Sequence, residues 1–405
     1  MSNLAKKRTG KTFLHKIYDS SNTYICTWGN EVMNTPKFNW AINGGMGEMQ
    51  IDLARPINDY SENVEVKVSN RIKTFILDDD NKDGMQIYDG IITSYDPIVS
   101  QDGKEYIRIH VASQLKTLND KILKSGNNTT LPYLSYDPSN IFTDILDKYA
   151  GVITYNSTSI VQTGTVASYT FSYVTCLEAI KKSLELCPAY WYWYIDGKSL
   201  FYLNVVDWDT TDHKLFFGKE AVEIDAKKSI EELYNAVYFV GGGTPNLYKL
   251  YERTSSIAEY GRREYKMQDD RVTLTTTAQL ISDKFLDEHD HPTAEMRVKI
   301  VDKCIDNTRG YDIESFKPGD TVQIIDPQVK TGITLWDIAK WDVDYWDFDI
   351  LSSLGQPLQI KNIDYNFDYC VLTLHSIAEE VSKRIEDIDR NLETVQSADI
   401  PSAPL

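Results

Sequence analysis

The feature that most constrains the fold is a pair of strand-like segments near the C-terminal end of the sequence. Residues 316–326 (FKPGDTVQIID) predict a turn and then a strand, because Pro318 fixes φ at the first turn position and Gly319 tolerates a positive φ at the second. Residues 365–376 (YNFDYCVLTLHS) have the composition of its pairing partner. The two segments predict the closing strands of a β-barrel that carries a long loop.

The loop between these two strands contains three Trp-Asp pairs at a spacing of five residues, which fits neither the helix nor the strand period. One interpretation is a protruding loop whose indoles stack on a sugar or on a partner protein. The other is that the indoles pack on the parent barrel or a neighbouring subunit, while the aspartates keep the loop soluble. The candidate residues are Trp336, Asp337, Trp341, Asp342, Trp346 and Asp347.

Length and composition indicate a globular, multidomain protein. The chain has 405 residues, and a domain spans roughly 100–200 residues, so two to four domains are expected. With 26 tyrosines and 8 tryptophans, the aromatic content is higher than usual, and such residues are common in strands and at interfaces. Fibrous and disordered classes do not fit this composition.

The charge is strongly acidic, with a formal value of −18. Such a body repels nucleic acid, so the sequence argues against DNA binding, although it does not argue against the passage of DNA. The first residues are basic, which predicts either an arm that reaches a neighbour or a solvated terminus. These basic residues are Lys6, Lys7, Arg8, Lys11 and Lys16.

The cysteines and the hydropathy pattern indicate folding in a cytosol. The 5 cysteines are scattered, odd in number and not spaced as metal ligands, which is typical of a reducing compartment. No apolar run is long enough to span a membrane, and the N-terminus lacks the apolar middle of a signal peptide.

The predicted fold class is mainly β with α+β parts: two β-barrel tube domains, an outer α+β module and a C-terminal helix. Residues 1–118 form the first barrel domain with its basic arm, since short strand patterns alternate with Asp-Gly and Gly-Gly turns from Thr12 to Leu118. Residues 119–228 form the α+β domain. Residues 229–375 form the second barrel with a helical insertion and the Trp-Asp loop.

Within the α+β domain, two helices and a hairpin are predicted. Residues 139–150 have a helical apolar face, with Ser139 as the N-cap, and residues 174–187 have a second one that ends before Pro188. Residues 189–205 predict a hairpin that turns at Asp196-Gly197. Aromatic residues occupy both faces of its first strand, so this strand is expected to be covered on both sides.

In the second β segment, residues 235–240 predict a strand and residues 248–267 an extended hairpin. A helix follows that ends before Pro292, with Leu280, Phe285 and Leu286 expected to be buried, and then a strand from residue 294.

Residues 376–405 predict a helix with coiled-coil spacing and a flexible tail. The helix either folds onto its own domain or forms a stem of three chains. Its candidate self-association residues are Val381, Ile385, Ile388, Leu392 and Val395.

No pattern in the sequence assembles a catalytic centre. The run Asp79–Gly84 matches half of an EF-hand loop but has Gly90 at the position of the essential glutamate, and the His289 and His291 cluster lacks further ligands. No phosphate-binding loop or serine elbow is present. The sequence therefore predicts a protein that is not an enzyme and has no cofactor and no metal site.

The order of a β-barrel, an α+β module, the phrase SIEELYNAVYFVGGG, a helical insertion and a strand opened by PGDTVQI resembles the baseplate-hub proteins of long-tailed bacteriophages. These proteins also form the N-terminal part of tail-associated lysins. The resemblance covers nearly the whole chain. Family members often carry a peptidase or muramidase further downstream, whereas this sequence stops at Leu405, so no lytic role is expected.

The resemblance implies a homotrimer in the virion, at the distal end of the tail tube, assembled in the cytoplasm of a host bacterium. Three chains with two barrels each would present six similar units to a sixfold tube and form part of the DNA-exit channel. The implied neighbours are the distal tail or tail tube protein, the tape measure protein and the tip or receptor-binding proteins. The alternative function is a receptor-binding tail module that holds a saccharide with the Trp-rich loop.

Overall fold

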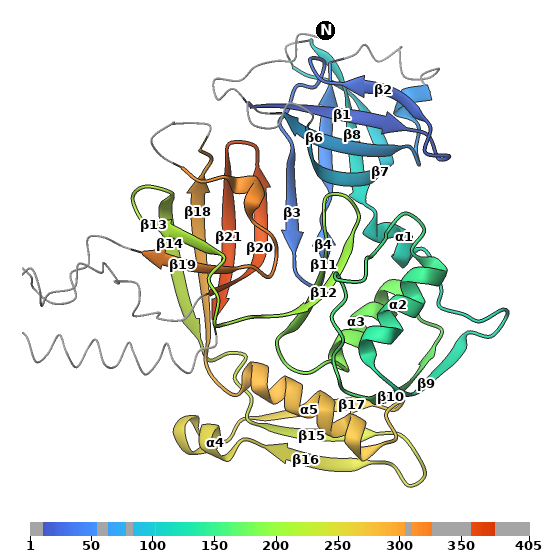
Figure 1. Cartoon of the computed structure of the whole chain (residues 1–405), viewed down its shortest axis with the longest axis vertical. Helices are drawn as coiled ribbons and strands as arrows, with labels where there is room; N and C mark the ends of the chain where they lie inside the picture. The colour runs from blue at the N-terminus through green and yellow to red at the C-terminus, as the bar shows by residue number, and fades with distance from the viewer. Residues whose placement is uncertain are drawn as a thin grey trace, which may run out of the picture.

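The computed structural model describes residues 11–54, 64–77, 84–101, 103–303, 310–325 and 358–376. Over these residues the fold is mainly β with α+β parts, as predicted (Figure 1). No helix in the described ranges combines the length and the apolar character needed to cross a bilayer.

The first sheet is antiparallel and has the order β2-β1-β6-β7-β8-β5. Its edges approach each other at a bridge between Val32, just after β2, and Leu53 in β5, so the sheet is strongly curved. The prediction placed turns at Asp-Gly pairs, but Asp89-Gly90 lies inside a long strand, β7. The strands are β1 (Thr12–Tyr18), β2 (Tyr24–Trp28), β5 (Met49–Leu53), β6 (Arg71–Leu77), β7 (Met85–Val99) and β8 (Glu105–Ser113).

The second sheet has the order β13-β19-β20-β21-β18-β14. Its two outer strands, β13 and β14, are consecutive in the chain and joined by residues 217–220, so this sheet also curls until its edges are neighbours. Two short 3-10 helices, Val64–Val66 and Ile313–Ser315, flank the sheets. The strands are β13 (His213–Phe216), β14 (Ala221–Ser229), β18 (Thr293–Val301), β19 (Thr321–Ile325), β20 (Leu358–Asn366) and β21 (Tyr369–Ser376).

The predicted pairing of the two closing segments is wrong in one respect. Strand β19 pairs with β20 at Thr321↔Gln359 and Val322↔Leu358, and residues 365–376 are the end of β20, the turn and the whole of β21. The chain reverses at Phe367-Asp368, a pair without the usual turn chemistry. Phe367 occupies the turn because its ring is buried, with 1% of its surface exposed. Gly319 has φ +95, as the predicted turn requires.

The α+β module follows the first sheet and contains the expected helices and hairpin. Asp137, and not Ser139, is the N-cap of α2, because its carboxylate accepts a hydrogen bond from the Ser139 amide and Pro138 occupies the first helical turn. Every residue of β11 is buried, as predicted. The elements are α1 (Leu115–Asn119), β9 (Thr130–Tyr136), α2 (Pro138–Tyr149), β10 (Ala167–Ser172), α3 (Cys176–Glu185), β11 (Trp191–Ile195) and β12 (Phe201–Val205).

Residues 230–292 leave the second sheet after β14 and return to it at β18. The expected hairpin over residues 248–267 is wrong: β16 and β17 do not pair but lie on opposite sides of β15, the second of them parallel to it. Leu286 is buried as predicted, whereas Leu280 and Phe285 are half-buried. The elements are β15 (Ala236–Gly241), β16 (Tyr248–Glu252), α4 (Thr254–Tyr260), β17 (Glu264–Asp269) and α5 (Thr275–His289).

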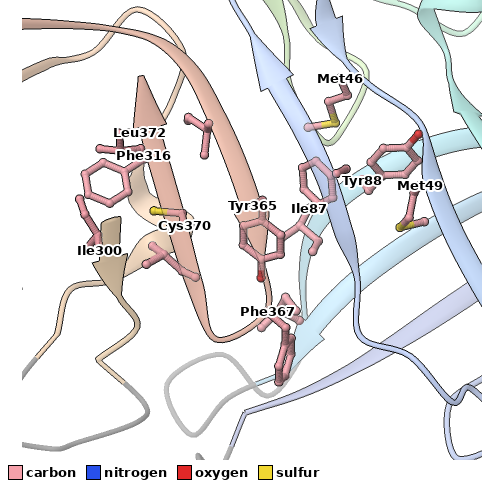
Figure 2. Close-up of a cluster of buried hydrophobic side chains, with 14 of the residues drawn as sticks. Met46, Met49, Ile87, Tyr88, Ile300, Phe316, Tyr365, Phe367, Cys370 and Leu372 are labelled. Carbon is pink, nitrogen blue, oxygen red and sulfur yellow. The ribbon is translucent and has the colours of Figure 1, made fainter. Parts of the chain in front are cut away.

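Two hydrophobic cores hold these parts together. The first is shared by the two curved sheets: Figure 2 shows Tyr365 of the second sheet next to Ile87 of the first. The second core is shared by the α+β module and the inserted unit, with side chains from α2, α3, β15 and α5. The curved sheets therefore form one packed body and the α and α+β parts another.

Candidate functional site

The structure does not place the two groups of candidate site residues that the sequence predicted. The Trp-Asp loop (Trp336, Asp337, Trp341, Asp342, Trp346 and Asp347) and the heptad positions (Val381, Ile385, Ile388, Leu392 and Val395) lie outside the described residues. The half EF-hand at Asp79 does so as well, apart from Gly84. In the described part of the chain, no group of three or more histidines, cysteines or carboxylates is arranged to hold a metal ion.

The two curved sheets and the α+β module meet at one place, which we call the junction. Strand β3 (Lys37–Ala41) belongs to the N-terminal part of the chain but pairs along β20 of the second sheet, with Phe38 opposite Tyr365. The Phe38 ring stacks on Tyr365 at 4.9 Å and lies 5.1 Å from Tyr88 of the first sheet. One strand thus joins both sheets (Figure 1).

The turn after β3 reaches the α+β module. Asn43 has φ 58, a conformation that asparagine tolerates, and leads into the short strand β4 (Gly45–Met46). Its amide donates to the Trp193 carbonyl at 2.7 Å, and its side-chain oxygen accepts from the Trp193 amide at 3.0 Å. The Trp40 indole N–H donates to the Ile195 carbonyl at 2.9 Å. Three directed hydrogen bonds therefore fix the β11–β12 hairpin against β3.

The predicted turn of that hairpin, at Asp196-Gly197, docks on the first sheet. The Gln86 amide of β7 donates to the Gly197 carbonyl at 2.6 Å. A Cβ atom at Gly197 would lie 2.6 Å from the backbone of Ile87, so only glycine permits this approach. A cavity of about 310 Å³ remains between the turn and the second sheet, lined in part by Trp40, Tyr194 and Phe316.

A buried carboxylate completes the contact between the hairpin and the first sheet. Asp89, with 2% of its surface exposed, accepts from Arg71 Nε at 2.8 Å, from the Gln114 amide at 3.0 Å and from the Ser199 hydroxyl at 2.8 Å. A second Arg71 nitrogen pairs with the other carboxylate oxygen. Arg71 begins β6 and Gln114 follows β8, both in the first-sheet part, whereas Ser199 follows the hairpin turn, so Asp89 ties the two parts together.

A second buried network joins the start of the chain to the second sheet. Lys11 lies just before β1 and has 1% of its surface exposed, so it is not part of a solvated terminus. Its ammonium pairs with Asp302 and Glu314, and the Tyr365 hydroxyl donates to Glu314 at 2.6 Å. Burial alone would lower the pKa of Lys11, but Glu314 and Asp302 outweigh burial and raise it. Burial raises the pKa of Glu314.

The stability of the first sheet is expected to fall in acid because of His15. This residue is 1% exposed, contacts the Thr74 hydroxyl at 2.8 Å, and burial lowers its pKa to about 3. Its unfolded pKa is about 6.5. A group whose folded pKa is depressed stabilises the protein above the unfolded pKa, and this contribution is lost as the pH falls from 6.5 to about 3.

At about 1.4 kcal/mol per pH unit, the buried neutral His15 alone lowers the free energy of unfolding at pH 4.5 by about 3 kcal/mol relative to pH 7. In His15→Leu, the drop in the free energy of unfolding between pH 7 and pH 4.5 should be smaller than in the wild type by about this amount. Urea unfolding at the two pH values measures the difference. Equal pH dependence in both proteins would exclude a neutral buried histidine at this position.

The junction residues Asn43, Asp89 and Glu314 were not predicted as site residues, and their local sequence explains why. Asp89 is followed by glycine and therefore carries the signal of a turn, and Glu314 stands in a polar stretch. Only Asn43, before two glycines, had a usable signal, since Asn-Gly predicts a positive φ. Buried ion pairs and hydrogen bonds make up the junction. Such contacts suit a role in holding the two sheets and the α+β module in fixed positions.

Comparison with known proteins was made at the level of sequence and of structure. No protein-family model and no curated protein matches the sequence. Three solved structures are similar over almost their full length. A prophage tail protein, gp18, from Listeria monocytogenes EGD-e is 11% identical with a TM-score of 0.53, and the match covers 94% of this chain and 99% of that one.

The 43 kDa tail protein of prophage MuSo2 from Shewanella oneidensis is 11% identical with a TM-score of 0.55, covering 90% of this chain and 98% of that one. A tail protein from Neisseria meningitidis MC58 is 10% identical with a TM-score of 0.55, covering 91% and 98%. Identities this low establish similarity of fold alone. The chain therefore has the fold of phage tail proteins, as the resemblance in its sequence implied.

Proposed function

We propose that this chain is a structural virion protein that forms a trimeric hub at the distal end of a phage tail tube. There it joins the tube to the tip or baseplate and lines part of the DNA-exit channel. The observation that carries this proposal is the similarity of fold to three tail proteins over at least 90% of this chain.

The arrangement of the two sheets supports the proposal. The resemblance in sequence implies a tube of sixfold symmetry, and a trimer of chains with two curved sheets each offers six units to such a tube. For the two sheets to act as equivalent units, they must hold a fixed relative position. The shared hydrophobic core, strand β3 and the Lys11 network supply this rigidity.

The charge also supports a channel. At −18 per chain, a trimer carries three times that charge, and a wall without a basic stripe does not hold the phosphates of passing DNA. In this proposal the protein performs no catalysis and holds no cofactor. Its partners are the distal tail or tail tube protein, the tape measure protein and the tip or receptor-binding proteins, in a virion assembled in the host cytoplasm.

Light scattering on the purified full chain tests the proposal. The expected mass is three times 46.4 kDa, and electron microscopy should show rings with a central channel. A zymogram with bacterial cell walls should show no clearing. A mass of one chain at every concentration, together with particles that have no channel, would contradict the trimeric hub, and clearing would contradict the absence of catalysis.

A further inference from the structure

A cavity of about 280 Å³ lies at the start of β11, whereas the junction cavity lies at the turn of the β11–β12 hairpin. Its walls come from the turn after β3, the start of β11, the segments after β12 and β14, the end of α5 with the residues before β18, and strands β20 and β21. Its volume is at the low end for ligand pockets and suits one small ring.

Two buried hydrogen-bond donors in its wall have no partner. The Gln359 amide nitrogen, on a side chain 6% exposed, and the Trp208 indole nitrogen are both enclosed and make no hydrogen bond to the described residues. A buried donor without an acceptor costs about 1–3 kcal/mol, so such groups are rare unless something binds them. Two of them in one cavity indicate that it takes a group with acceptor oxygens.

The charged residues in the wall narrow the class of ligand. Lys361 stands two residues from Gln359 on the same strand, and four carboxylates line the same cavity. Asp287 already pairs with Arg253 and Asp290 with His291, whereas Glu232 and Glu288 act on Lys361. The carboxylates disfavour the binding of an anion, and the lysine disfavours the binding of a cation. Burial lowers the pKa of Lys361, with Glu288 and Glu232 acting against burial. A neutral ligand that both donates to carboxylates and accepts from the amide, indole and ammonium groups fits all of these residues.

The aromatic walls indicate the body of the ligand. Tyr190 and Trp208 meet edge to face, with ring centroids 6.0 Å apart, and Tyr192 lines the same space. Aromatic faces bind apolar C–H surfaces while their polar ends hydrogen-bond, which suits a ring with C–H bonds on its faces and hydroxyls at its edge. Open-chain polyols have the hydroxyls but lack the flat face.

We propose that this cavity is a binding site for one sugar ring of a neutral saccharide, with Gln359, Trp208 and Lys361 donating to its oxygens and the two glutamates accepting from its hydroxyls. The proposal rests neither on the Trp-Asp loop nor on the trimeric hub. It gives a tail protein of this fold a saccharide contact within its own body.

The test uses saturation-transfer difference NMR on the full chain with free D-glucose, D-galactose, L-rhamnose and N-acetylglucosamine as probes. At least one should bind with a dissociation constant on the order of 1 mM, while sorbitol and sodium acetate should not. In Gln359→Leu the affinity for that sugar should fall about tenfold, because one acceptor on the ligand loses its donor. Trp208→Phe, which keeps an aromatic face, should give a similar loss.

The matched control is Gln268→Leu, the same substitution at an exposed residue of β17, which should bind the sugar as the wild type does. Gln359→Leu removes a donor without a partner, so its thermal unfolding midpoint should stay within a few degrees of the wild type and any lost binding is not a folding defect. Absence of transfer to all four sugars, binding of acetate alone, or equal binding by Gln359→Leu and the wild type would each overturn the assignment.

Discussion

Replacing Asp89 by alanine is expected to lower the free energy of unfolding by about 3–5 kcal/mol, because it leaves the Arg71 guanidinium buried beside no charge. The loss should exceed that of an ordinary salt bridge because Gln114 and Ser199 lose their acceptor at the same time. Asp89→Asn should be nearly as destabilising. The NH₂ group of the asparagine would face the donors of Arg71, Gln114 or Ser199, where the carboxylate accepts hydrogen bonds. Urea unfolding followed by tryptophan fluorescence measures both variants.

The control for this prediction lies on the same strand. Asp96 in β7 pairs with His110 at 3.1 Å, but its side chain is 61% exposed. Asp96→Ala should change the free energy of unfolding by less than about 1 kcal/mol. If Asp89→Ala and Asp96→Ala cost the same small amount, the Asp89 network does not stabilise the contact between the hairpin and the first sheet.

The parts of the fold that the sequence predicted correctly depend on neighbours along the chain. The hairpin turns at Asp196-Gly197 as predicted, and the Asp196 carboxylate accepts hydrogen bonds from the nearby Lys198 and Leu200 amides. Helix α3 begins with a complete capping box between Thr175 and Glu178, and its apolar side is set by a spacing of three and four residues. Such signals are contained in a few adjacent residues, and the structure reproduces them.

The parts that failed depend on neighbours far away in the sequence. Gly90 has the local signal of a turn, yet a Cβ atom there would lie 2.6 Å from the Ala112 carbonyl, so glycine is required by the adjacent strand β8. Nothing next to Phe38 indicates that it pairs with Tyr365, more than three hundred residues away. The alternation of a strand predicts its faces but not its partner.

The junction was missed for the same reason. Lys11 stands among basic residues, which favours a solvated arm, and only the folded chain brings Asp302 and Glu314 to it. A buried lysine between two carboxylates is a non-local feature, since its partners lie about three hundred residues further on. The contribution of Lys11 to the free energy of unfolding depends on the burial of its ammonium group and not on its charge alone.

Replacing Lys11 by methionine is therefore expected to lower the free energy of unfolding by about 3–5 kcal/mol at pH 7, because two buried carboxylates lose their shared cation. The deficit should shrink in acid. Burial already raises the folded pKa of Glu314, and Lys11 is what opposes this rise, so the pKa rises further in the variant. A raised folded pKa means stability that is present below the unfolded value, about 4.3, and is lost as the pH increases.

Urea unfolding of Lys11→Met and the wild type at pH 7 and pH 4 measures this difference, with Lys37→Met as the matched control. Lys37 begins β3 and is exposed, so its replacement should change the free energy of unfolding by less than about 0.5 kcal/mol at either pH. Combining Lys11→Met with Glu314→Gln should recover part of the loss at pH 7, since one unpaired charge is removed. A deficit that is the same at both pH values, with no recovery in the double variant, would mean that Lys11 stabilises the protein by packing alone.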